Sequence, residues 1–132
     1  FLMMKINKNI VVTAAILGAL TIMIGAFGAH GLKELISEKA LTSFETGVRY
    51  QMYHVIVLLI LGFATQIPIK TQKWVFLFFI IGILFFSGSI YLLTLNEYLP
   101  FDAKTIAFIT PIGGFLLIIG WLRLAYGVIV NK

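Results

Sequence analysis

The sequence predicts an all-α integral membrane protein, a bundle of four transmembrane helices. Hydrophobic residues make up 61% of the 132 residues and charged residues only 11%, whereas soluble domains are about half apolar and a quarter charged. The mean hydropathy of +1.05 indicates the same class. The chain contains four apolar runs, each close to the roughly 20 residues that cross the hydrocarbon core. Because these runs use most of the chain, we expect one membrane domain over residues 1–132.

The four predicted transmembrane helices cover residues 10–29, 48–67, 74–95 and 105–128. The first run is longer than the apolar core of a signal peptide, about 7–15 residues. We therefore favour a retained helix over a cleaved signal. Because two methionines stand at positions 3 and 4, we also expect translation to start at Met3 or Met4.

The segment between the first two runs has the pattern of an amphipathic helix. Apolar residues recur there near helical spacing, opposite charged ones such as Lys33, Glu34, Glu38 and Lys39. Such a helix lies in the plane of the membrane interface with its apolar face in the lipid. The pattern predicts a short interfacial helix over residues 32–46.

The distribution of basic residues predicts the orientation. With four spans, both ends of the chain lie on one side, and that side carries more Lys and Arg than the other. Basic loops stay in the cytoplasm, so we expect both termini to be cytoplasmic. Trp74, Trp121 and Tyr126 are then expected near the inner interface, as part of an aromatic belt.

Small residues mark two predicted helix-packing seams. One lies along the first span and the other recurs every seventh residue on the fourth. Small residues let neighbouring backbones approach closely, which drives helix association in lipid. The seams favour packing within the bundle or between copies in a homo-oligomer, and less strongly a ligand against exposed backbone. The seam residues are Ala14, Gly18, Thr21, Gly25 and Gly28, and then Gly113, Gly120 and Gly127.

Polar side chains on three of the spans are expected to meet in the outer half of the bundle. An ionisable group in lipid costs at least about 2.5–3.5 kcal/mol on insertion scales, so His54 should face protein or water. Glu45 with Arg49, and Tyr50 with His54, are each spaced i, i+4 and share a helical face. The predicted cluster comprises His30, Glu45, Arg49, Tyr50, His54, Ser87, Ser89, Tyr91 and Thr110.

Two interpretations of this cluster remain open. The first is a binding or proton-handling site, since the pKa of histidine lies near neutrality. The second, which we favour, is a hydrogen-bonded knot that stabilises the fold, with Glu45 and Arg49 paired. A metal site would need His30 and His54 to converge, and their spacing matches no usual ligand pattern.

Several classes of function find no support in the sequence. There is no cysteine, no phosphate-binding glycine loop and no zinc or hydrolase signature. We therefore expect no catalytic residues, no metal and no cofactor. The net charge of +5 comes from basic residues scattered at the ends of apolar runs, which argues against nucleic acid as a partner.

Four motifs together resemble one family. They are Gly25-Ala26-Phe27-Gly28-Ala29-His30-Gly31-Leu32, the stretch from Phe44 to His54, Phe86-Ser87-Gly88-Ser89-Ile90-Tyr91, and Thr110-Pro111-Ile112-Gly113-Gly114. The chain is similar over residues 4–127 to the small bacterial membrane proteins of the domain-of-unknown-function 423 family. The resemblance implies an intact four-span inner-membrane protein and carries no catalytic residues with it.

Taken together, these patterns predict a non-enzymatic bundle whose partners are membrane lipids and further copies or subunits. It would act as an accessory or assembly subunit, or bind a lipid or small ligand. The alternative is an oligomeric transporter or channel for a small solute or ion. A membrane enzyme with His30 or His54 as general base is the least favoured interpretation.

Overall fold

The computed structural model describes residues 5–132, so the expected start residues Met3 and Met4 lie outside it. The described part is entirely helical, and four of its segments are long and apolar enough to cross a membrane. The elements are α1 (Lys8–His30), η1 (Leu32–Glu34), α2 (Glu38–Phe63), α3 (Ile69–Ile83), η2 (Leu84–Gly88), α4 (Ser89–Thr94), η3 (Asn96–Tyr98), η4 (Ala103–Ile106) and α5 (Ile109–Val130).

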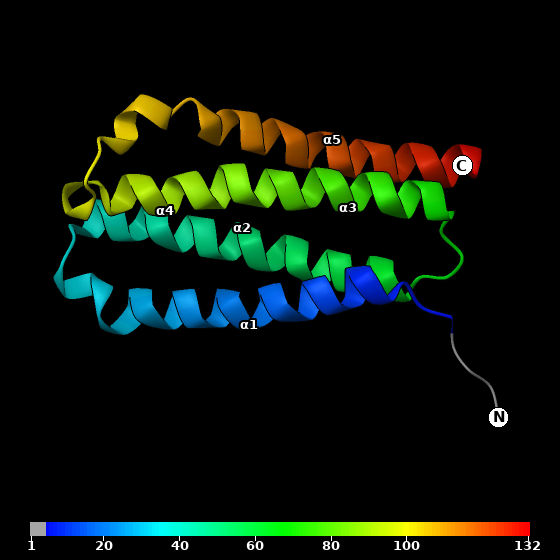
Figure 1. Ribbon diagram of the computed structural model, residues 1–132, viewed down its shortest axis with the longest axis horizontal. Helices are drawn as coiled ribbons and strands as arrows, with labels where there is room; N and C mark the ends of the chain where they lie inside the picture. The colour runs from blue at the N-terminus through cyan, green and yellow to red at the C-terminus, as the bar shows by residue number, and fades with distance from the viewer. Residues whose placement is uncertain (1–4) are drawn as a thin grey trace.

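The four spans run side by side, and α1 begins at the same end of the bundle as α5 finishes (Figure 1). The most extensive contacts join α1 to α2 and α3 to α5, while α2 and α3 join the two pairs. The third span is built from α3, η2 and α4 in succession, with η2 a π-helical turn. In Figure 1, α1 and α5 are the two outermost spans of the array.

Hydrogen bonds of Asn7 and Gln72 connect the ends of three helices near the chain termini. The Asn7 side chain accepts a hydrogen bond from the Ile10 amide, which satisfies a free donor in the first turn of α1. At the same level the Asn7 amide donates to the Gly62 carbonyl oxygen at 2.9 Å. The Gln72 amide of α3 donates to the carbonyl oxygens of Leu61 and Ala64. These bonds hold α1, α2 and α3 together at one end.

The predicted separate interfacial helix over residues 32–46 is not present. Residues Leu32–Glu34 form only a 3₁₀ turn, and α2 then runs unbroken from Glu38 to Phe63. Ser37 starts this helix by accepting a hydrogen bond from the Ala40 amide at 3.1 Å, as an N-cap does. No proline lies between Glu38 and Phe63, so the helix continues without a break into its apolar part. The amphipathic pattern therefore belongs to the first turns of α2.

The last candidate span covers Ala103–Val130, close to the predicted residues 105–128, and its first part is not α-helical. A 3₁₀ helix over Ala103–Ile106 comes first, and α5 starts only at Ile109. Pro111 is thus the third residue of α5, where its missing amide hydrogen costs no intrahelical bond. Proline limits how far the regular helix can extend toward the preceding loop.

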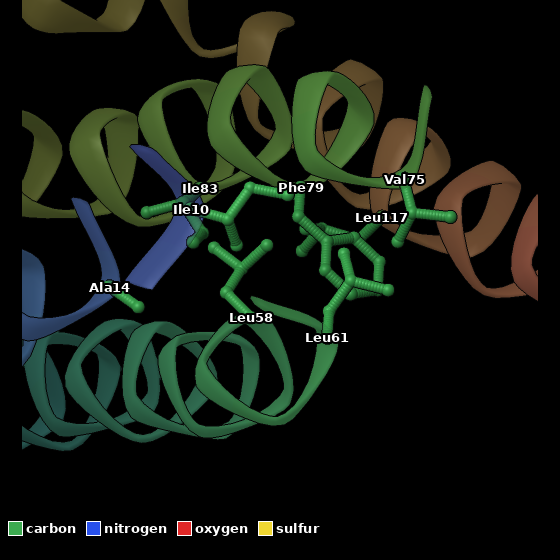
Figure 2. Close-up of a cluster of buried hydrophobic side chains, with 8 residues drawn as sticks. All are labelled: Ile10, Ala14, Leu58, Leu61, Val75, Phe79, Ile83 and Leu117. Carbon is green, nitrogen blue, oxygen red and sulfur yellow. The ribbon is translucent and has the colours of Figure 1, made fainter. Parts of the chain in front are cut away.

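A compact apolar core fills the half of the bundle that is closest to the chain termini (Figure 2). It draws side chains from all four spans, and Leu58 and Phe79 are fully buried in it. Many large apolar side chains on the outer faces of α1 and α5 are exposed, as expected for surfaces in contact with lipid. The core residues are Ile10, Ala14, Leu58, Leu61, Val75, Phe79, Ile83 and Leu117.

Candidate functional site

Both small-residue seams pack against other helices of the same chain. On α1, a Cβ atom at Gly25 would lie 3.3 Å from Val48, and one at Gly28 would lie 2.8 Å from Phe44, so this seam faces α2. Ala14 and Thr21 are buried, and Gly18 faces Val55 of α2. The α1 seam is therefore occupied by packing within one copy.

The second seam, on α5, packs against the third span. A Cβ at Gly120 would lie 2.5 Å from the Phe79 ring, and one at Gly127 would clash with Thr71. At Gly113, a Cβ would clash with the backbone nitrogen of Phe86. Only glycine allows α5 to approach η2 this closely.

The predicted polar residues do not form a single cluster. A first group links α1, α2 and α4 through a buried glutamine that the sequence analysis did not single out. Gln51 donates to the Thr21 hydroxyl at 2.7 Å and accepts from the Tyr91 hydroxyl at 2.7 Å. Thr21 in turn donates to the Leu17 carbonyl oxygen. Three helices are thereby joined by one chain of hydrogen bonds.

A second group lies around the π-helical turn. The Ser87 hydroxyl donates to the Gly47 carbonyl oxygen of α2 at 2.7 Å. Ser89 contacts the carbonyl oxygens of Phe85 and Phe86, which a π-helical turn leaves with altered partners. Its hydroxyl also lies 2.5 Å from the Thr110 hydroxyl of α5. These serines join the third span to α2 on one side and to α5 on the other.

The third group pairs His54 with a tryptophan. His54 Nδ1 donates to the Tyr50 carbonyl oxygen at 2.7 Å, and its Nε2 lies 3.1 Å from Trp121 Nε1. Since indole nitrogen only donates, Nε2 accepts and the imidazole is neutral in this arrangement. His54 is buried and lies nearer to Phe63 than to Glu38 along α2. It is therefore placed with Trp121 and not with Arg49 and the serines.

The remaining predicted residues are exposed and separate. His30, the last residue of α1, donates to the Ala26 carbonyl oxygen at 2.9 Å. Arg49 donates to the Thr46 hydroxyl at 3.1 Å, so it is placed with Thr46 instead of the expected partner Glu45, which is exposed. Within residues 5–132, no three His, Asp or Glu side chains gather as a possible metal site.

The hydrogen-bond geometry of the buried groups is complete. Among residues 5–132, every buried side-chain nitrogen or oxygen atom has a hydrogen-bond partner. Satisfied polar groups of this kind rigidify a bundle, which favours the structural interpretation of the buried members. Sequence reasoning missed Gln51 and Trp121. Their pairing depends on helix rotation, and Trp121 had been expected in the aromatic belt.

Two open grooves on the membrane-facing surface meet at Thr46. The first, of about 770 Å³, lies at the end of the bundle away from the chain termini. It is lined by Ser37, Lys39, Ala40, Ser43, Thr46, Ile90, Leu93, Thr94 and Lys104. The second, of about 530 Å³, continues toward the bundle middle. It is lined by Thr46, Tyr50, His54, Phe86, Pro111, Gly114, Phe115, Leu117, Ile118 and Trp121.

The two grooves follow one face of α2. Lys39, Ser43, Thr46, Tyr50 and His54 are spaced by three or four positions, so they lie in one row along the helix. The first groove carries two lysines and several hydroxyl groups among apolar side chains, whereas the second is lined mainly by aromatic and aliphatic side chains. We call the two together the lateral groove.

A further groove, of about 820 Å³, lies at the other end of the bundle. It is lined by residues 5–9 of the chain together with Thr65, Ile67, Ile69 and Gln72.

Comparison with known proteins places the chain among bacterial membrane proteins. It is 45% identical to a UPF0382 membrane protein of Staphylococcus saprophyticus, over 85% of this chain and 92% of that one. It is 40% identical to a UPF0382 membrane protein of Haemophilus influenzae, over 96% and 97%. It is 34% identical to the UPF0382 inner membrane protein YgdD of Escherichia coli, over 96% and 93%.

The family comparison agrees with the motifs found in the sequence. No solved structure matches the chain significantly, so the fold rests on the structure described above. The model of a protein family of unknown function matches residues 24–114, which contain the four motifs that carried the resemblance. The membrane prediction and the resemblance are both confirmed: the chain belongs to the DUF423 family of membrane proteins.

Proposed function

We propose that this protein is a non-enzymatic membrane protein that binds one amphiphile, a lipid or a lipid-like molecule, in the lateral groove. The observation that carries this proposal is the continuous row of α2 residues along which the polar and apolar grooves meet at Thr46. The volume of the apolar groove, about 530 Å³, lies within the roughly 300–1,000 Å³ range of small-molecule sites.

The length of the groove suits a lipid. Ser43 and His54 are 11 positions apart, which is about 16 Å at roughly 1.5 Å per residue. One leaflet contributes about 15 Å to a hydrocarbon core of roughly 30 Å. The groove from Ser43 to the His54–Trp121 pair therefore matches the depth of one leaflet, with the headgroup beside Ser43 and the acyl chain below Thr46.

Orientation is part of the proposal. The basic residues favour cytoplasmic termini, which puts Lys39 and Lys104 at the outer surface of the inner membrane. A lipid of the outer leaflet would then enter the groove sideways from the membrane. Binding of this kind fits an accessory or assembly role better than a through-path, because the buried polar atoms are already paired within the chain.

Filling the groove tests the proposal. A Cβ at Gly114 would lie 3.5 Å from the Phe86 ring, an ordinary contact, whereas a Cβ at Gly88 has nothing within 4 Å. Gly114 lines the groove and Gly88 does not. We expect Gly114→Leu to lose the lipid that the wild-type protein retains through purification, as counted by native mass spectrometry, because leucine occupies its place.

Gly88→Leu is the matched control and should keep the retained lipid. Equal retention by the wild-type protein and by both folded variants would exclude the lateral groove as the site. The same preparations, reconstituted in liposomes, test the transporter alternative. Solute or proton flux that disappears in His54→Ala would favour transport over binding.

A further inference from the structure

We infer that the amphiphile in the lateral groove is an anionic lipid, whose headgroup is held between Lys39 and Lys104. This inference rests on the proposed function and adds the chemical class of the ligand. The argument comes from charge and from the order of side chains along the groove.

The headgroup end of the groove is basic. Lys39 comes from the first turn of α2 and Lys104 from η4, so two separate elements each contribute a lysine to the lining of this part of the groove. None of the residues that line the two described grooves is acidic. An ammonium group is a compact donor that suits phosphate and carboxylate.

Hydroxyl groups and an arginine lie just below the lysines. Ser43 and Thr46 line the same part of the groove, and Thr46 accepts a hydrogen bond from Arg49. This bond holds the guanidinium beside the point where the polar and apolar parts meet. Ser43 and Thr46 therefore extend the polar end of the groove down to the start of its apolar part.

The acidic residues near the groove do not line it. Glu38 and Glu45 of α2 are exposed and do not line the groove. The Asp102 side chain accepts hydrogen bonds from Asn96 and from the Lys104 amide, so it is engaged in the loop. The groove itself therefore presents a positive headgroup end above an apolar channel for the acyl chain.

Quenching of tryptophan fluorescence by brominated lipids measures this preference at the site. Trp121 lines the groove and Trp74, the other tryptophan, does not. In a Trp74→Phe protein, which keeps the ring that stacks on Phe78, Trp121 is the sole reporter. Vesicles contain phosphatidylcholine mixed with phosphatidylglycerol, and either lipid carries the bromine.

We expect phosphatidylglycerol to be preferred over phosphatidylcholine at Trp121 by at least about fivefold, the effect of one basic side chain near an anionic lipid. The double variant Lys39→Gln/Lys104→Gln should reduce the preference to about one. Lys33→Gln is the control, because Lys33 is exposed near the same end of the bundle and does not line the groove. A Trp121→Phe protein, reporting from Trp74, should not respond to the lysine substitutions.

The outcomes separate the inference from the proposed function. If Gly114→Leu changes Trp121 quenching while the two lipids quench equally, a lipid binds but the anionic class is wrong. If Lys33→Gln removes the preference as strongly as the double variant does, general surface charge is responsible and the inference fails. If Gly114→Leu leaves quenching unchanged, the proposed function itself fails.

Discussion

The two halves of the bundle are held together by different interactions. Near the chain termini, side chains from all four spans form an apolar core around Leu58 and Phe79 (Figure 2), and hydrogen bonds of Asn7 and Gln72 join the helices beyond it. Toward the other end, side-chain hydrogen bonds between helices are added to the apolar packing, as in the chain from Thr21 through Gln51 to Tyr91. Hydrogen bonds restrict the helix arrangement more than apolar contacts do, because each bond requires one donor and one acceptor at a defined distance.

The comparison shows how a membrane bundle selects one arrangement of helices. Lipid is as apolar as leucine, so the hydrophobic effect does not favour core over lipid. The apolar half must therefore depend on close packing, and the polar half on pairing groups that lipid cannot satisfy. The lateral groove begins at Lys39 in the polar half and reaches the apolar core at Leu117.

The largest effect is expected where α5 meets the π-helical turn. A Cβ at Gly113 would clash with the Phe86 backbone, so Gly113→Ala must push the two helices apart and disturb the Ser89–Thr110 contact. We expect a loss of about 3 kcal/mol of unfolding free energy, the upper part of the usual overpacking range. Unfolding in mixed micelles, followed by circular dichroism, measures it.

The neighbouring glycine provides the control for this change. Gly114→Ala places its Cβ 3.5 Å from the Phe86 ring, which is an ordinary contact. It should leave stability nearly unchanged. Equal costs for the two substitutions would mean that helix propensity, and not the close approach, explains the effect.

A core truncation tests the apolar half. Leu58 is fully buried, and Leu58→Ala leaves a cavity among the core residues. In soluble proteins such a change costs 2–5 kcal/mol, part of which is transfer from water. Because lipid replaces water here, we expect about 2 kcal/mol, measured by the same unfolding method. Leu59→Ala, on the exposed side of α2, should cost much less.

The smallest expected effect concerns one hydrogen bond of the polar half. Tyr91→Phe removes the donor to Gln51 Oε1 and keeps the ring that packs on Phe44. Interhelical hydrogen bonds in membranes average about 0.6 kcal/mol, and we expect a loss of that size. Tyr53→Phe, at an exposed position, is the control. A loss at Tyr91 larger than that for Leu58→Ala would reverse our comparison of the two halves.

Much of the fold is predictable from local pattern, because spans are read from length and apolarity alone. The errors fell where helices meet water. The interfacial helix over 32–46 was assigned from an amphipathic pattern that in fact belongs to the start of α2, and Ser37 marks that start. The last span begins with a 3₁₀ helix over Ala103–Ile106, where an α-helix was predicted.

The candidate site was less predictable, because it depends on how helices are rotated. His54 was expected with Arg49 and the serines, but its partner is Trp121, 67 positions away. Gln51 joins three helices. The sequence around it does not distinguish it from other polar residues in a transmembrane span. The groove itself involves α2, α4, η4 and α5 together.

The sequence by itself determined that this chain resides in a membrane, how many times it crosses and where small residues permit close packing. These properties depend on the composition of single segments, since each span must satisfy its own backbone hydrogen bonds in lipid. Only the tertiary structure decided that the seams face inward, that the polar residues divide into separate groups and that a groove runs from Lys39 to Trp121. Those outcomes depend on the rotation and pairing of helices, which apolar surfaces in lipid do not specify by themselves.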